Sequence, residues 1–225
     1  MLGRGTYGVV TEAMNELTGE MVALKRIELR HHPSAMLALQ QAQSEIDLLR
    51  RMRHPNVVGI KGSFQAEGAF YVVMELVSGR SIADLLIDLG PFHELVIRRF
   101  TKQILEGLKY CHKNGCLHRD IVSSLMLLSP RSSKHIPPRS SSCCCSYFIL
   151  IEQKGKNILL TVEGDVRICD FGGAKLRRSA GGEGEEADQE DLQASATFSY
   201  TPLWVAPEAI STGQYNEGAD VWSLG

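Results

Sequence analysis

The chain carries five short motifs in a fixed order, and they read GRGTYGVV (3–10), VALK (22–25), HRD (118–120), DFG (170–172) and APE (206–208). Each string alone is a weak signal, because a glycine-rich turn, a surface lysine or a tripeptide often arises by chance. Their joint occurrence in this order is far too improbable to be accidental. The five motifs therefore indicate one site built from residues that are distant in the sequence.

The glycine-rich string predicts a turn that lies close to phosphate groups. Gly3, Gly5 and Gly8 form a GxGxxG pattern, and glycine lets main-chain N–H groups approach an anion closely. A strand-like Val9-Val10 follows, whereas a dinucleotide-binding turn leads directly into a helix. A plain glycine-rich hairpin is the alternative, and the lysine that ends the apolar stretch 22–25 favours the phosphate-binding interpretation.

Hydrophobic periodicity divides the chain into a β-rich first part and a helical second part. We expect strands within 2–29 and 57–77, and helices over 34–52, 81–89 and 93–114. Strands followed by helices predict an α+β fold with two lobes. The expected domains are a β-rich N-lobe with its hinge at 1–77 and a mainly helical, incomplete C-lobe at 78–225.

The composition is typical of a globular protein and excludes several other classes. The 225 residues are 44% hydrophobic and 22% charged, with a formal net charge of −2, unlike collagen-like, coiled-coil or wholly disordered chains. No basic field or long apolar run points to nucleic acid or membrane as a partner. The N-terminal stretch has no signal-peptide pattern, so we expect a cytoplasmic protein, with the nucleus as a further location, and reduced cysteines.

Together the motifs resemble the catalytic domain of the eukaryotic protein kinases, and the resemblance covers nearly the whole chain except 122–153. It is most similar to serine/threonine kinases of the STE group, and within that group to the MAP kinase kinase kinase (MEKK-like) branch. The strings that carry this likeness are ALKRI (23–27), HPNVV (54–58), GAK (173–175) and TPLWVAPE (201–208). The resemblance implies transfer of the ATP γ-phosphate to serine or threonine hydroxyls of a protein, expected to be a downstream kinase in a MAP kinase cascade.

The resemblance also implies catalytic roles for four residues. Lys25 would bind the α- and β-phosphates and pair with Glu45 on the helix that follows. Asp120 would accept the proton of the substrate hydroxyl or orient it, with Lys154 beside it. A lysine near this aspartate is typical of serine/threonine kinases rather than tyrosine kinases.

The implied cofactors are ATP and Mg²⁺. Asn157 and Asp170 would bind the metal, and the glycine loop would cover the phosphates. Met74 would be the gatekeeper of the adenine site. The residues implied to surround adenine are the hinge residues Glu75 to Val77 and the apolar residues Val10, Ala23 and Leu159.

Several further residues have supporting roles by the same resemblance. Asp220 would brace the HRD backbone, although its helix is expected to be cut short here. Arg119 could pair with an activation-loop phosphate placed by an upstream kinase, at Thr197 or Ser199, whereas Thr201 is expected to be structural. The residues implied to stack between the lobes, and equally compatible with plain core positions, are Leu49, Ile60, His118 and Phe171.

Residues 122–153 interrupt the catalytic loop. The family's loop reads HRDxKxxN, whereas Asp120 is followed here by IVSSL (121–125). Joining Ile121 to Lys154 restores the string HRDIKGKNILL. The segment is rich in serine, proline and cysteine without periodicity, which is typical of a loop or linker, and its 32 residues are unusually many for a compact domain.

Two interpretations of this segment stay open. A retained intron is favoured, because valine codons, as at Val122, begin with GT and a glutamine codon, as at Gln153, can end with AG. A genuine loop insertion is the alternative, and looping it out would still let Lys154 and Asn157 reach their places. We predict that the insertion greatly reduces or abolishes phosphotransfer, so the alternative function is a pseudokinase-like chain that binds nucleotide or partners.

Overall fold

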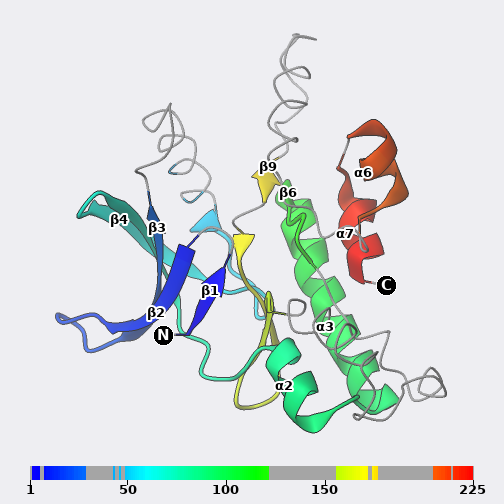
Figure 1. Cartoon of the computed structure of the whole chain (residues 1–225), viewed down its shortest axis with the longest axis horizontal. Coiled ribbons are helices and arrows are strands. Elements are labelled where there is room, and N and C mark those ends of the chain that lie inside the picture. The colour runs from blue at the N-terminus through cyan, green and yellow to red at the C-terminus, as the bar shows by residue number, and fades with distance from the viewer. Residues whose placement is uncertain are drawn as a thin grey trace, which may run out of the picture.

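The structure is a computed structural model that describes residues 2–5, 8–28, 43, 46, 49–121, 156–171, 174–176, 205–213 and 215–224. A twisted β-sheet lies on one side of the molecule and helices lie on the other, with short strands between them (Figure 1). The predicted α+β arrangement, a β-rich lobe beside a helical lobe, is confirmed.

The N-terminal sheet has five antiparallel strands in the order β1-β2-β3-β5-β4. The strands are β1 (Gly3–Gly5), β2 (Gly8–Met14), β3 (Met21–Glu28), β4 (Ile60–Ala66) and β5 (Ala69–Glu75). A two-residue turn joins β4 to β5, and both of its residues have positive φ, 51° at Glu67 and 70° at Gly68. Such turns match the right-handed twist of paired strands, so they fix the register of this hairpin.

Two helices form the centre of the second lobe, close to where the sequence predicts them. Helix α2 (Ile82–Leu89) begins after Ser81, whose hydroxyl accepts a hydrogen bond from the Asp84 amide at 3.1 Å. Such a cap satisfies one of the free N–H groups at a helix start. Helix α3 (Glu94–Lys113) buries one stripe, which consists of Ile97, Phe100, Ile104, Gly107, Leu108 and Cys111.

Short strands and two further helices complete the described part of this lobe. Strand β6 (Cys116–Leu117) pairs with β9 (Lys175–Leu176), and β7 (Ile158–Leu160) pairs with β8 (Val166–Ile168). Helix α7 (Glu217–Leu224) packs beside α3, and α6 (Pro207–Thr212) precedes it in the chain (Figure 1). These elements bring the HRD, DFG and APE regions of the sequence into one lobe.

The predicted helix over 34–52 is described at only a few positions. Residues 43, 46 and 49 are helical, whereas Leu39 lies outside the described residues. Met52 lies beyond the last helical position that is described, yet it is buried with Ile46 and Leu49 in one cluster, as the spacing predicts. The apolar face was therefore predicted better than the end of the helix.

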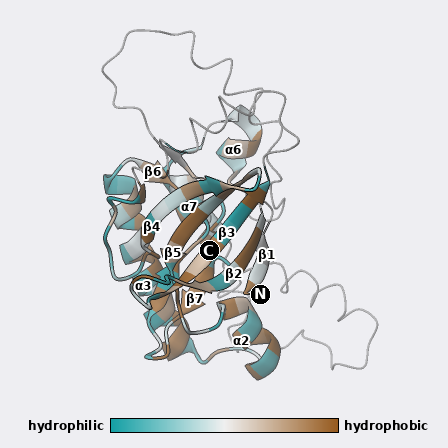
Figure 2. Ribbon diagram, turned by 90° about the vertical axis from the view of Figure 1, so that its left-hand side faces the viewer, coloured by the Kyte–Doolittle hydropathy of each residue, from teal (hydrophilic) through white to brown (hydrophobic). Residues whose placement is uncertain are grey.

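Two large hydrophobic clusters form the core of the molecule, one within the helical lobe and one between the sheet and α3. Figure 2 shows hydrophobic and hydrophilic residues alternating around the helices, as expected for helices that are buried on one side. The cluster of the helical lobe consists of Ile82, Leu86, Ile97, Phe100, Ile104, Leu108, Ile121, Ile158, Leu160, Val166, Ile168 and Leu224. The cluster between the sheet and α3 consists of Ile46, Leu49, Met52, Val57, Ile60, Phe70, Val72, Cys111 and Cys116.

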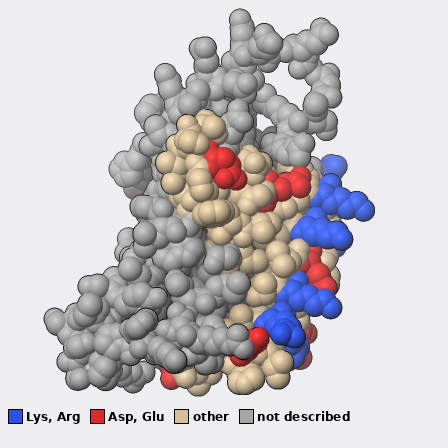
Figure 3. Space-filling view, turned by 90° about the vertical axis from the view of Figure 1, so that its right-hand side faces the viewer, with Lys and Arg blue, Asp and Glu red and all other residues tan. Residues whose placement is uncertain are grey.

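The outer face of α3 is charged with both signs (Figure 3). Glu94 pairs with Arg98 at 3.6 Å, and Lys102 pairs with Glu106 at 3.9 Å, each one turn apart. Exposed pairs of this kind add little stability and mark a solvated surface. Within the described ranges, no helix is long and apolar enough to cross a membrane.

Candidate active site

Strand register places four of the predicted nucleotide-site residues on one face of the sheet. Val10 on β2 lies opposite Lys25 on β3, and Ala23 lies opposite Met74 on β5. Cross-strand partners share a face, and residues two apart in a strand also share it. Val10, Ala23, Lys25 and Met74 therefore face the same side.

Lys25 is held by an aspartate from the other lobe. It is only 5% exposed, and its Nζ forms an ion pair with Oδ1 of Asp170. A buried ammonium group is unfavourable unless an opposite charge accompanies it. The pair thus joins the VALK and DFG motifs, whereas the predicted partner Glu45 lies outside the described residues.

Asp170 itself has an unusual backbone conformation. Its φ is 61°, and that of Arg119 in the HRD motif is 66°. Left-handed conformations are uncommon for residues other than glycine and are found where the surroundings compel them. Two of the sequence motifs therefore contain a backbone turn that the fold must hold in place.

The catalytic loop is assembled across the interrupting segment. The Asn157 Nδ2 atom donates hydrogen bonds to the main-chain carbonyl of Asp120 at 2.9 Å and to its Oδ2 atom at 2.8 Å. Ile121 and Ile158, which flank these two residues, are fully buried. Asn157 thus contacts Asp120 despite the inserted residues between them, while Lys154 lies outside the described residues.

The oxygen atoms of Asn157 and Asp170 fit a divalent cation. The Asn157 amide nitrogen is engaged by Asp120, which leaves its Oδ1 atom as the group that can bind a cation. The Cys169 amide donates to the Asn157 carbonyl at 2.9 Å, so Asn157 lies next to the start of the DFG motif. One carboxylate and one amide oxygen are hard ligands of the kind Mg²⁺ takes alongside phosphates and water.

His118 connects the HRD and DFG motifs. Its Nε2 atom donates to the Cys169 carbonyl at 3.0 Å, and its Nδ1 atom accepts from the Asp120 amide at 3.3 Å. Its ring lies 4.8 Å from that of Phe171, which packs in turn against the cluster that contains Leu49 and Ile60. Of the predicted stack, His118 and Phe171 thus form a ring contact, and Phe171 packs against the cluster of Leu49 and Ile60.

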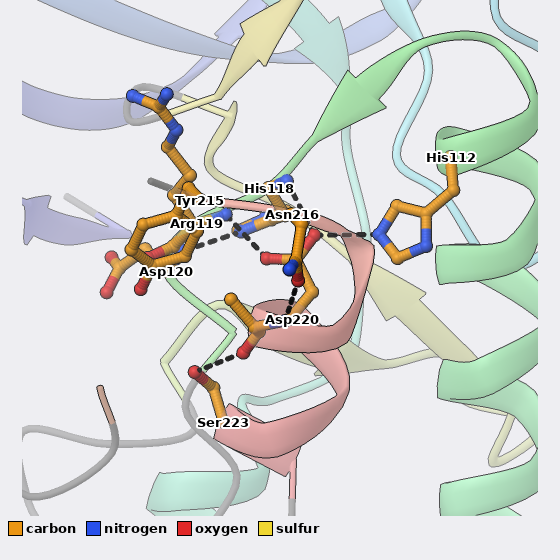
Figure 4. Close-up of polar contacts among 9 residues, drawn as sticks. His112, His118, Arg119, Asp120, Tyr215, Asn216, Asp220 and Ser223 are labelled. Carbon is orange, nitrogen blue, oxygen red and sulfur yellow. Dashed lines mark hydrogen bonds and ion pairs between the residues drawn. The ribbon is translucent and has the colours of Figure 1, made fainter. Parts of the chain in front are cut away.

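Asp220 on α7 braces the HRD backbone from below (Figure 4). Its Oδ2 and Oδ1 atoms accept hydrogen bonds from the amides of His118 and Arg119, at 2.9 and 2.8 Å. Burial alone would raise the pKa of this carboxyl, yet the hydrogen bond from His112 and those of the two amides hold the pKa below its ordinary value. The brace is thus complete within the described part of α7.

His112 is a member of this network that sequence reasoning missed. Its Nε2 atom lies 2.8 Å from Asp220 Oδ2, and its side chain is 9% exposed. Because an ionised carboxylate only accepts, the histidine donates. The one available signal was a polar residue directly after the buried stripe of α3, which ends at Cys111.

Tyr215 contacts the same loop and was also missed. Its ring lies 5.6 Å from the Arg119 guanidinium carbon, and its hydroxyl donates weakly to the Arg119 carbonyl at 3.5 Å. Figure 4 shows Tyr215 beside Arg119 and Asp120. Thr197 and Ser199, the predicted phosphorylation sites whose phosphate would pair with Arg119, lie outside the described residues. Thr201 lies outside them as well.

The remaining predicted site residues lie around this centre. Gly3 and Gly5 are in β1, and Gly8 opens β2, where a Cβ atom would lie 1.9 Å from the Arg26 carbonyl oxygen. This close approach to β3 is therefore sufficient by itself to require glycine at position 8, without any contact to a phosphate. Glu75 ends β5 and a half-buried Val77 follows it, while Leu159 lies in β7 of the other lobe.

Comparison with known proteins agrees with this geometry. The protein kinase domain model matches residues 1–136 and 148–225. One relative, mitogen-activated protein kinase kinase kinase YODA of Arabidopsis thaliana, is 34% identical over 100% of this chain and 21% of its own length. Another, mitogen-activated protein kinase kinase kinase 19 of Mus musculus, is 32% identical over 100% of this chain and 14% of its own length. A third, ANP1 of Arabidopsis thaliana, is 29% identical over 100% of this chain and 28% of its own length.

The chain thus spans less than a third of the length of these three relatives. The predicted likeness to MAP kinase kinase kinases is confirmed, and the family uses ATP and a divalent metal. With the ordered motifs, the assembled lysine, aspartates and asparagine, and the matching domain model all in agreement, the chain belongs to the protein kinase family.

Proposed function

We propose that this chain transfers the γ-phosphate of ATP, bound with Mg²⁺, to serine or threonine hydroxyls of a protein. The observation that carries the proposal is the contact of Asn157 with both the carbonyl and the carboxylate of Asp120, beside the Lys25–Asp170 ion pair. Phosphoryl transfer needs positioning and charge neutralisation more than covalent chemistry. These four residues supply a cation, an orienting carboxylate and two oxygen ligands.

The chemistry assigns each residue one task. Asp120, oriented by Asn157, accepts a hydrogen bond from the substrate hydroxyl and aligns it with the phosphate. When nucleotide binds, the Lys25 ammonium group exchanges part of its contact with Asp170 for contacts with phosphate oxygens. Asp170 and Asn157 would hold Mg²⁺, which would supply positive charge to balance that of the phosphates.

The substrate we propose is another kinase in a MAP kinase cascade. The printed names of the relatives, mitogen-activated protein kinase kinase kinases, support this class. An acidic residue just before Asn157 would favour substrates with basic residues ahead of the phosphosite. Lys156 occupies that position here, which argues against a strong preference for such substrates. We further propose a cytoplasmic location and activation by an upstream kinase through the Arg119 guanidinium.

A second candidate function is nucleotide binding without phosphotransfer. The observation that favours it is the position of residues 122–153, which separate Asp120 from Lys154 in the sequence. Lys154 is one of the implied catalytic residues, and the insertion falls directly between it and the proton acceptor. A chain of this kind would act as a binding partner in place of an enzyme.

The test uses the full chain and radiolabelled ATP with Mg²⁺. Nucleotide binding is measured by calorimetry, and phosphate transfer is measured on a general protein substrate and on an inactive MAP kinase kinase. We expect binding, and transfer that is slow because residues 122–153 interrupt the catalytic loop. Transfer should be lost in Asp120→Asn, and both binding and transfer should be lost in Lys25→Met. Lys102→Gln, which removes only a surface ion pair on α3, is the matched control. Binding without transfer supports the second candidate, and neither binding nor transfer overturns both.

A further inference from the structure

The side chain of Glu75 reaches from the hinge end of the sheet toward the other lobe. Its Oε1 atom lies 3.6 Å from Nη2 of Arg167, in the middle of β8. Its Oε2 atom accepts a hydrogen bond from the Gly59 amide at 3.3 Å, and its own amide donates to the Gly59 carbonyl at 2.8 Å. Both carboxylate oxygens are therefore engaged on the side of the hinge that faces β8.

Residues 56–59 lie between these two elements and bond to both. The Ile168 amide donates to the Asn56 carbonyl at 2.9 Å, and the Val58 amide donates to the Ile168 carbonyl at 2.8 Å. The buried Asn56 side chain also donates to the Val166 carbonyl at 3.0 Å. The main-chain bonds thus fix 56–59 to β8, and the Glu75–Arg167 pair adds a side-chain bond from the hinge to the same strand.

Arg167 depends on Glu75 for a direct ionic contact. Asp165 is close enough for Arg167 to lower its pKa, but Gln103 and Arg99 are the stronger causes and hold its carboxylate by hydrogen bonds. The Arg167 Nε atom is buried and finds no hydrogen-bond partner within the described part of the chain. Among the carboxylates that the structure describes near Arg167, Glu75 is thus the one that forms an ion pair with it.

The two residues are placed to affect nucleotide binding without touching the phosphates. Glu75 directly follows Met74, and Arg167 lies opposite Leu159 in the β7–β8 register. Arg167 is also three residues before Asp170. The Glu75–Arg167 pair therefore adds a direct contact between the hinge and the strand pair that carries Leu159 and leads to Asp170.

We propose that Arg167 is a positioning residue for nucleotide binding, acting through its ion pair with Glu75. The proposal rests on the ATP-dependent activity proposed above, in which the hinge and Leu159 enclose adenine. In this structure Lys25 is paired with Asp170, and Phe171 packs on His118. The Glu75–Arg167 pair is therefore formed in the assembled arrangement of the site and stabilises it. Loss of the pair is expected to weaken nucleotide binding and to leave the chemical step unchanged.

The experiment measures KM for ATP, kcat and the Kd of ATP–Mg²⁺ in the full chain. For Arg167→Gln and for Glu75→Gln we expect a rise of about fivefold in KM and Kd, the scale of a partly exposed ion pair, with kcat unchanged within about twofold. The double variant should be no worse than either single variant, because both remove one interaction. Arg167→Lys should restore most of the affinity, which a purely structural loss would not do.

The matched control is Arg99→Gln, which breaks an ion pair of 2.9 Å to Asp165, next to β8 but away from the hinge. Its KM should equal that of the wild type. The positioning role is overturned if the wild type binds ATP while both Gln variants keep its KM and Kd, or bind more tightly. It is also overturned if the losses of the two variants add. A wild type that binds no ATP overturns the proposed function itself, so the two failures are distinguishable.

Discussion

The Asn157 amide donates to two atoms of Asp120, at 2.9 and 2.8 Å, across 37 positions of sequence. In a continuous catalytic loop these residues would be only five positions apart, as the string HRDIKGKN requires. Local sequence therefore does not determine this contact here. It is supported by the buried neighbours on each side, Ile121 and Ile158, which belong to one hydrophobic cluster.

Deletion of residues 122–153, which joins Ile121 to Lys154, should stabilise the chain. The contact between Asn157 and Asp120 is already formed, so the deletion mainly removes the entropy of closing a long connection, about 2 kcal/mol. Urea unfolding of both chains at pH 7 measures the difference. A deletion variant less stable than the full chain would mean that the removed residues contribute native contacts.

Substitution of His112 by alanine should lower phosphotransfer through Asp220. The change removes one of three donors to a buried carboxylate, so we expect kcat to fall about tenfold, with KM for ATP unchanged. His112→Gln, which can still donate, should recover most of the rate. The exposed neighbour Lys113→Ala is the control. Equal loss in the Ala and Gln variants would show that the histidine ring matters for packing alone.

Asp220→Asn should lower stability by about 2 kcal/mol at pH 7, since hydrogen bonds to a charged acceptor are lost. The pKa of Asp220 is held below its ordinary value of 3.8, so its ionised form stabilises the native state. That contribution is complete above the ordinary pKa and disappears as the pH falls through the lowered one. The difference between the two chains in urea unfolding should therefore shrink below about pH 4. A difference that grows with acidity would contradict the lowered pKa.

Gly79→Ala should disrupt the junction between the hinge and β7. A Cβ atom at Gly79 would lie 1.5 Å from the Leu160 carbonyl oxygen, whose residue also bonds through its amide to Arg80 at 2.9 Å. Because backbone must shift, we expect a loss of about 3 kcal/mol or more, seen in thermal and urea unfolding. Gly62→Ala, where no atom lies within 4 Å of the added Cβ, is the control and should stay near the wild type.

The Cys169 thiol should react slowly despite its place beside the DFG aspartate. Burial and the nearby Asp170 carboxylate raise its pKa to about 12, and the Lys25 ammonium only partly opposes them. Because the thiolate is the nucleophile, alkylation by iodoacetamide at pH 8 should be at least about 100-fold slower than for free cysteine. Peptide mapping by mass spectrometry separates this cysteine from the others. Labelling as fast as free cysteine would refute the raised pKa.

Strand and helix positions could largely be predicted because they follow from periodicity and from local turn residues. The strands of 57–77 meet at Glu67-Gly68, and α3 buries the stripe that its spacing indicates. Helix ends were less certain, as at Met52, because tertiary burial continues past the last helical turn. Apolar spacing reports which face is buried more directly than where a helix stops.

The candidate site could be predicted only where a motif names the residue. Lys25, Asp120, Asn157 and Asp170 were identified by resemblance and lie together in the structure. His112 belongs to the same network and has no motif of its own. Its role depends on α7 packing against the end of α3, which no local pattern reports.

By itself, the sequence determined the chemical groups of the site and the order of its elements, because phosphate transfer needs a lysine, carboxylates and glycines at set places along the chain. The tertiary structure alone decided which of them meet. Glu75 contacts Arg167, and His112 contacts Asp220, 108 positions away. Such contacts depend on how strands and helices pack in space, since distance along the chain does not limit which charged side chains find a partner.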